Sequence, residues 1–160
     1  MKSASSKDIK SALEHLDETE LSALCLRLAR FKKENKELLT YLLFQSQDET
    51  QFIQDVRQEI CDSFSEMNDS NLYLLKKSIR KIIRQTEKHI RYSGIDSTAA
   101  ELYMELLRNL KPYHIQISKS TVMRNMYASI NKKLEKIISD LHEDLQYDFH
   151  KALRSIALDF

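Results

Sequence analysis

A single glycine, Gly94, and a single proline, Pro112, occur in a chain of 160 residues. Tight hairpin turns and phosphate-binding loops need residues that accept positive backbone φ angles, so this chain can build very few of them. The shortage of glycine also excludes the P-loop and the Rossmann dinucleotide-binding motif, which need glycines at fixed spacing. Leucine, isoleucine, lysine and glutamate recur instead at helical spacing. The sequence therefore predicts an all-α protein.

The helical segments number about seven and alternate with short polar turns. This order predicts antiparallel helices, arranged as a bundle or as a short stack similar to HEAT or armadillo repeats. The length fits one domain, residues 1–160, with a core that buries about two thirds of the surface of the unfolded chain. Residues 1–6 are expected to form a flexible N-terminus.

The first third of the chain predicts two capped helices and an apolar segment. Ser5 or Ser6 can begin a helix over residues 7–16, and Asp17 with Glu20 has the spacing of a capping box. Residues 38–44 are apolar nearly all round, which favours a place in the core. One buried stripe is expected on the second helix: Leu21, Leu24, Cys25, Leu28 and Phe31.

An acidic helix is predicted over residues 48–67, beginning at Asp48 or Thr50. Its inner face carries Phe52, Ile53, Val56, Ile60, Phe64 and Met67. Its outer face carries Asp55, Glu59, Asp62 and Glu66. A short polar turn then leads into the helix of opposite charge.

That next helix, residues 72–92, separates apolar from basic side chains cleanly. Its apolar residues fall within an arc of about 100° and indicate a buried face: Leu72, Leu75, Ile79, Ile82, Ile83, Thr86 and Ile90. The opposite side carries seven cations: Lys76, Lys77, Arg80, Lys81, Arg84, Lys88 and Arg91. We call these seven residues the basic face. Gly94 has the position of a left-handed residue that ends the helix.

The last third predicts one more short helix and one long apolar stripe. Asp96 or Ser97 is expected to cap the short helix, Pro112 to end it, and residues 113–117 to form an irregular connection. The stripe then runs from Met123 to Ile156. A break near residues 139–141, where Asp140 and Glu143 have capping-box spacing, is favoured over one protruding helix that would indicate a homodimer.

In element order and charge pattern, the chain resembles a family of small bacterial all-helical proteins of unknown function, from about residue 8 to residue 157. The similarity is carried by LDETELSALCLRLARFKKENKELL, by the acidic helix, and by the basic helix that ends in SGID. This resemblance implies an all-helical fold and assigns no activity, cofactor or catalytic residue.

Catalytic and metal-binding patterns are not found in the sequence, so we expect a non-enzymatic protein with no cofactor. His15, His89, His114, His142 and His150 show neither the HExxH nor the Glu-x-x-His spacing of helical metal sites. Cys25 and Cys61 lie far apart among apolar helical positions, which favours core packing in a reducing compartment. The N-terminus lacks the apolar region of a secretory signal, and the longest uncharged run is too short to span a bilayer. A cytoplasmic protein without membrane contact is expected.

Two binding functions remain open. A protein–protein interaction or scaffold role with an unidentified partner is favoured, because helical arrays without catalytic residues commonly present a groove to another chain. Met123 and Met126 are candidates for such a contact surface. The alternative is binding of nucleic acid or another polyanion by the basic face, with Tyr73 and Tyr92 as stacking groups. The alternative requires that the acidic helix over residues 48–67 leave the basic face uncovered.

Overall fold

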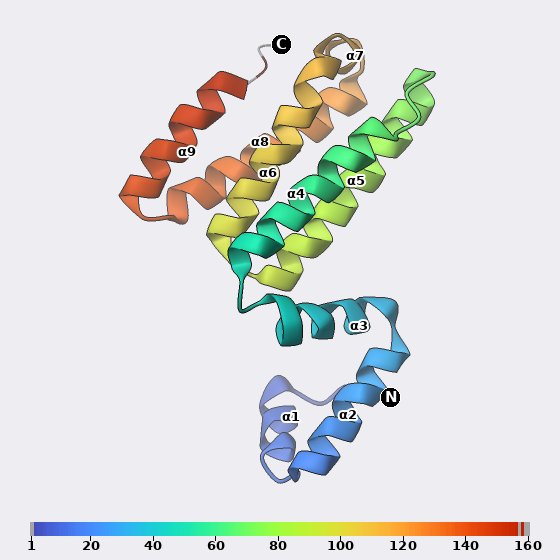
Figure 1. The fold of residues 1–160 in the computed structure, drawn as a ribbon, viewed down its shortest axis with the longest axis vertical. Helices are drawn as coiled ribbons and strands as arrows, with labels where there is room; N and C mark the ends of the chain where they lie inside the picture. The colour runs from blue at the N-terminus through green and yellow to red at the C-terminus, as the bar shows by residue number, and fades with distance from the viewer. Residues whose placement is uncertain (1, 157, 159–160) are drawn as a thin grey trace. The chain divides into compact units, whose positions relative to one another are not determined.

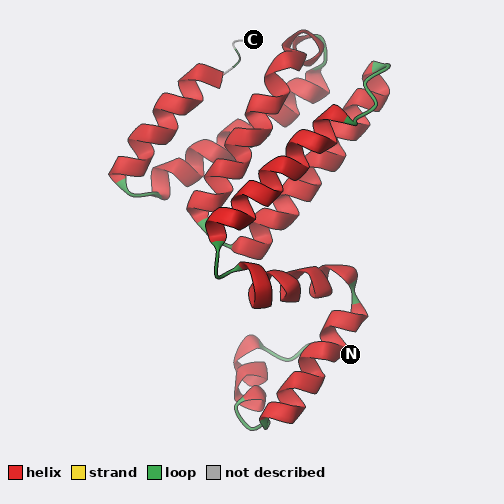
Figure 2. Ribbon diagram, viewed as in Figure 1, coloured by secondary structure: helices red, strands yellow, loops and turns green. Residues whose placement is uncertain are grey.

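The computed structural model describes residues 2–156 and 158, and its fold is all-α, as predicted (Figure 2). The α-helices are α1 (Ser6–Leu13), α2 (Glu18–Phe31), α3 (Lys33–Thr40), α4 (Glu49–Ser65), α5 (Leu72–Ser93), α6 (Asp96–Leu110), α7 (His114–Ser118), α8 (Thr121–Asp140) and α9 (Glu143–Ile156). A π-helical turn covers Tyr41–Gln45 and a 3₁₀ turn covers Lys111–Tyr113. The chain divides into two compact units, residues 1–44 and 45–160. The prediction of one domain stays a prediction, and Met1, within the N-terminus expected to be flexible, lies outside the described residues.

The first unit begins with two capping boxes. The Ser5 hydroxyl accepts a hydrogen bond from the Asp8 amide, and the Asp8 carboxylate accepts one from the Ser5 amide. Asp17 and Glu20 make the same reciprocal pair at the start of α2. Each pair satisfies amides that have no partner within the first turn of a helix. The predicted cap at Asp17 is confirmed, whereas α1 ends at Leu13, short of the predicted Leu16.

The apolar residues of the first unit are more exposed than the sequence predicts. No residue of α1, α2 or α3 is buried, and the Phe31 side chain is 76% exposed. In residues 38–44, expected in the core, Tyr41 is buried but Phe44 is 76% exposed. The predicted buried stripe on the second helix is therefore wrong. The helical spacing does place apolar residues along one stripe of α2, which has 14 residues. Helices α1 and α3 have only eight residues each, which is too short to cover that stripe.

The second unit is a helical bundle built around α6 (Figure 1). Helices α4, α5, α8 and α9 pack against α6, and α4 and α5 also lie side by side as a hairpin. Helix α6 has buried residues on all of its sides: Thr98, Ala99, Ala100, Leu102, Tyr103, Met104, Leu106, Leu107 and Leu110. Burial of this much apolar surface is the main stabilising contribution to the bundle, at about 25 cal/mol per Å².

Two local predictions for the last third differ from the structure, and a third is confirmed in part. The α6 N-cap is Ile95, which makes no side-chain cap, in place of Asp96 or Ser97. Residues 113–117 are mostly helical, in the 3₁₀ turn and α7, because i to i+3 and i+4 bonds can continue past Pro112 when proline sits in the first turn. The break near residues 139–141 is confirmed, although Asp140 ends α8 and does not cap α9.

Among the described residues, no helix combines the length and the apolar character needed to cross a membrane.

Candidate functional site

Helix α5 carries the basic face, and local chemistry fixes both of its ends. The Asn71 side chain accepts a hydrogen bond from the Leu74 amide at the N-terminus. At the C-terminus Gly94 adopts a φ of 66° and its amide donates to the Ile90 carbonyl at 2.9 Å. A left-handed residue at this position is the usual way to end a long helix. The inner side of α5 buries Leu75, Ile79, Ile82 and Thr86, so the opposite side is turned outward.

Six of the seven residues of the basic face line one groove with a volume of about 830 Å³: Lys76, Lys77, Arg80, Lys81, Arg84 and Lys88. We call it the basic groove. Tyr73, which is 71% exposed, lies at its N-terminal end, and the other described lining residues are Asn68, Leu74, Ser78 and Gln85. No carboxylate is found among the described residues that line it. The seventh cation, Arg91, lies outside this groove and near enough to Tyr103 to act on its hydroxyl electrostatically.

The acidic face of α4 leaves the basic groove uncovered. Glu59 is the member that reaches α5, where its carboxylate accepts from Gln85 Nε2 at 2.5 Å and lies 3.1 Å from His89 Nε2. Asp55 and Asp62 accept hydrogen bonds from glutamines one turn earlier on α4, at 2.8 Å in both cases. Glu66 and Lys81 both line a separate hollow of about 280 Å³ and form no ion pair with each other. The two helices are neighbours, as their order indicates, but their rotation keeps most of the opposite charges apart.

The basic face is accordingly rich in unneutralised charge. Within residues 2–156 and 158, six of its members form no ion pair: Lys76, Lys77, Arg80, Lys81, Arg84 and Arg91. Lys88 Nζ lies 6.0 Å from the centre of the Tyr92 ring, in reach of a cation–π contact. Closely spaced like charges repel one another, so an anion that bound here would relieve that repulsion.

A second groove of about 470 Å³ lies between α5 and α8, which both pack on α6. We call it the α5–α8 groove. Arg80 and Arg84 line this groove as well as the basic groove, so their side chains separate the two. The rest of its lining is mixed: Ile83, Glu87, Val122, Asn125, Met126, Ser129, Ile130 and Lys133. Of the two methionines considered as contact surface, Met126 lines this groove, whereas Met123 is buried in the core.

The acid in this groove is neutralised by a neighbouring lysine. Glu87 accepts a hydrogen bond from Lys133 Nζ at 2.5 Å, which links α5 to α8. Glu87 also lies close enough to the hydroxyl of Tyr103 on α6 to act on it electrostatically. Burial, with the negative charge of Glu87 beside it, raises the pKa of Tyr103 to about 12. The Tyr103 hydroxyl therefore stays protonated at neutral pH.

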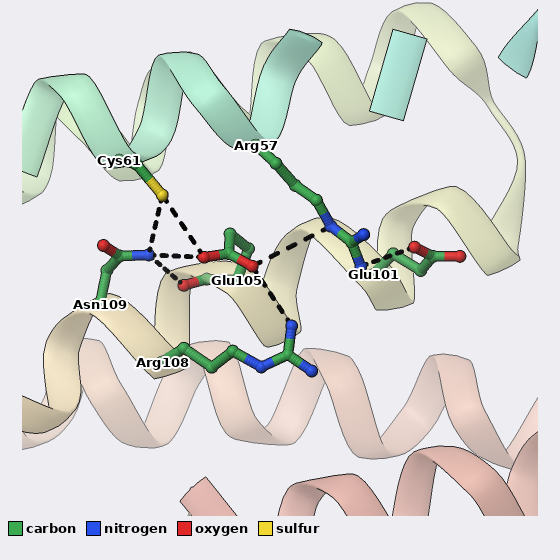
Figure 3. A network of polar contacts seen from close by, with 6 residues as sticks. All are labelled: Arg57, Cys61, Glu101, Glu105, Arg108 and Asn109. Atoms are coloured by element: carbon green, nitrogen blue, oxygen red, sulfur yellow. Dashed lines mark hydrogen bonds and ion pairs between the residues drawn. The ribbon is translucent and has the colours of Figure 1, made fainter. Parts of the chain in front are cut away.

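A polar cluster on the other side of α6 joins α4 to α6 (Figure 3). Arg57 Nη2 lies 2.7 Å from a Glu101 oxygen, and Glu105 accepts from Asn109 Nδ2 at 2.8 Å and from Arg108 Nη1 at 3.2 Å. The Cys61 thiol donates to the same Glu105 carboxylate, with 3.6 Å between sulfur and oxygen. The cluster lies on the helix interface and lines no described cavity, so we interpret it as a structural link.

The prediction that both cysteines pack in the core is wrong. Cys25 is exposed, and Cys61 is half-buried in that polar cluster. The described residues also bring together no group of three or more His, Cys, Asp or Glu side chains that could hold a metal ion. His89 contacts Glu59, His142 contacts Asp144 at 3.5 Å, and His15 Nδ1 contacts the Ser11 carbonyl at 2.7 Å.

Apart from Met126, the sequence does not predict the α8 side of the α5–α8 groove. Val122, Asn125, Ser129 and Lys133 belong to the flank of α8, between its buried stripe and its solvent-facing side. Their spacing of three and four residues is the available signal, but it does not identify the helix they face. No protein-family model, curated protein or solved structure matches this chain.

Proposed function

We propose that this protein binds a polyanion through the basic face of α5. The observation that supports it most is the gathering of six cations around one groove without a carboxylate among its described lining residues. Lys76, Arg80, Arg84 and Lys88 follow one another at intervals of four residues and span about 18 Å along the helix. A row of this length can contact several successive phosphates of an extended chain.

The expected binding energy is mainly electrostatic. Each lysine or arginine that neutralises a phosphate releases condensed counterions, so affinity falls as salt rises, with a slope proportional to the number of contacts. Four such contacts give a slope of log affinity against log salt of about −3 for a single strand and about −3.6 for a duplex. A partner bound through apolar surface would show a far smaller slope.

Charge reversal at the middle of the row tests this proposal. Arg80→Glu with Arg84→Glu is expected to lower the affinity for a heparin column and for labelled oligonucleotides, and to reduce the salt slope. The matched control is Lys132→Glu with Lys136→Glu, which makes the same change of net charge on exposed positions of α8 outside both grooves. Unchanged retention of the Arg80/Arg84 variant, or an equal loss in the control, would refute the proposal.

Protein interaction is a second candidate, favoured by a separate groove within the first unit. This groove of about 670 Å³ between α2 and α3 has apolar walls that include Leu26, Leu39, Leu43 and Phe44. Four cations stand around it: Arg30, Lys32, Lys33 and Lys36. An apolar channel between cations is complementary to an amphipathic helix with acidic flanks, and we propose such a helix of a partner protein as its occupant.

A synthetic acidic amphipathic peptide, with leucines at helical spacing and glutamates beside them, tests the second candidate. Leu26→Asp should abolish its binding, measured by fluorescence anisotropy. Leu28→Asp should leave binding unchanged, because Leu28 lies on the same helix with nearly equal exposure, 52% against 50%, but outside the groove. Equal binding of a peptide with lysines in place of the glutamates, or self-association of the chain through this groove, would contradict the proposed occupant.

A further inference from the structure

The α5–α8 groove differs chemically from the basic groove beside it. Ile83, Val122 and Met126 supply an apolar surface, and Val122 is 40% exposed. Asn125 and Ser129 add an amide and a hydroxyl on the α8 side. The acidic side chain here, Glu87, is already bonded to Lys133. An apolar hollow with a few polar groups is typical of a site for a flat organic group with a hydrogen-bonding edge.

Arg80 and Arg84 connect this hollow to the polyanion surface, since both side chains line both grooves. A phosphate held by either arginine lies at the mouth of the α5–α8 groove. In a nucleic acid, the group attached next to the phosphate and sugar is a base, which is flat and apolar on its faces and polar at its edges. The asparagine amide both donates and accepts, so Asn125 can pair with the edge of a base.

We infer that the α5–α8 groove binds an unpaired base of a single-stranded nucleic acid whose backbone lies along Arg80 and Arg84. This inference depends on the proposed function. A single strand satisfies the site because its bases are available, whereas a duplex base must first be flipped out at a cost in stacking and pairing. Tyr73, largely exposed at the end of the basic groove, offers a stacking surface for a second base.

A comparison of four polyanions tests the ligand class. The full chain is titrated with a labelled mixed-sequence 12-mer, its annealed duplex and a 12-mer with every base removed, and polyphosphate is used as an unlabelled competitor. We expect the intact single strand to bind at least about fivefold more tightly than the duplex and the base-free strand, because base contacts contribute beyond the phosphates. Equal or tighter binding of the duplex or of the base-free strand would overturn the inference.

Variants of α8 test the position. Ser129→Leu fills the groove and Asn125→Ala removes its amide, and both sites are exposed, so neither change disturbs the core. Each should lower single-strand affinity several-fold and leave polyphosphate binding unchanged. The control is Ala128→Leu, at the adjacent exposed position outside the groove, which should bind normally.

The two possible failures give different results. If the proposed function is wrong, no polyanion binds in a way that depends on Arg80 and Arg84. If this inference alone is wrong, Arg80/Arg84 reversal still lowers the affinity for polyanions, but Ser129→Leu and Asn125→Ala bind all four polyanions like the unchanged protein.

Discussion

Glu59 Oε2 lies 3.1 Å from Nε2 of His89, although the N–H direction at His89 departs from that of a linear hydrogen bond. The other Glu59 oxygen accepts from Gln85, one turn earlier on α5. Gln85 and His89 are four residues apart and share one edge of the helix, beside the basic face. This contact therefore helps to fix the rotation of α4 against α5. Among the described residues of the basic face, the six cations that form no ion pair are Lys76, Lys77, Arg80, Lys81, Arg84 and Arg91.

Glu59 should make the free energy of unfolding depend on pH in the acidic range. The contact with His89, supported by the bond from Gln85, holds the pKa of Glu59 below its ordinary value of 4.5, although partial burial acts in the opposite direction. Because the unfolded chain takes up this proton first, the contribution is fully present above about pH 4.5 and is lost as pH falls through the lower folded pKa. Glu59→Gln should cost about 0.5–1 kcal/mol at pH 7, a range reduced for solvent screening. Urea unfolding between pH 7 and pH 3 should show that difference shrinking, whereas Asp55→Asn should show almost none.

The sequence predicts those features of the site that depend on interactions between residues close together in the chain. It does not predict the features that depend on contacts between separate helices. The sequence predicts the bounds of α5 to within a residue, because the signals that set them are all local: its apolar period, Asn71 and Gly94. The sequence does not determine the rotation of α4, because an acidic helix beside a basic helix can turn its charged face toward or away from that helix. The contact between Glu59 and His89 decides between the two.

Long-range packing accounts for the rest. The apolar stripes of α2 and α6 look alike in sequence, yet Leu28 is exposed and Leu106 is fully buried. Periodicity reports that a face is apolar and does not report whether another helix covers it. The α5–α8 groove was not predicted for the same reason, because α6 brings together two helices that are distant in sequence.

Glu105 should be important for the stability of the α4–α6 interface (Figure 3). Glu105→Ala removes the acceptor for Asn109 and Cys61 and leaves Arg57 with less compensation for its charge. A cost of about 2 kcal/mol is expected, because partly buried polar groups lose their partners. Arg108→Ala removes an exposed arginine from the same cluster and should cost less than about 0.5 kcal/mol. Urea unfolding at pH 7 gives both values, and similar costs for the two variants would show that Glu105 acts as an ordinary surface charge.

The two cysteines should react with thiol reagents at different rates. Burial, with the negative charge of Glu105 nearby, raises the pKa of the Cys61 thiol, so little thiolate forms at neutral pH. Cys25 is exposed. Ellman's reagent should therefore show a fast phase and a slow phase, and Cys25→Ser should remove the fast one. The slow phase should accelerate as pH rises to 9, and a fast reaction of Cys61 at pH 7 would contradict its placement in the cluster.

Gly94 should be replaceable by other residues only at a cost in stability. A Cβ built there meets no atom within 4 Å, so a side chain causes no clash with its surroundings. The left-handed φ of 66° alone penalises a side chain, by about 1 kcal/mol for alanine. Asparagine tolerates this conformation better, so Gly94→Asn should be less destabilising than Gly94→Ala. Thermal unfolding of the two variants measures the difference, and the reverse order would mean that contacts, and not the backbone, determine this position. Both should bind polyanions normally while folded, because Gly94 ends the helix beyond Arg91 and lines neither groove.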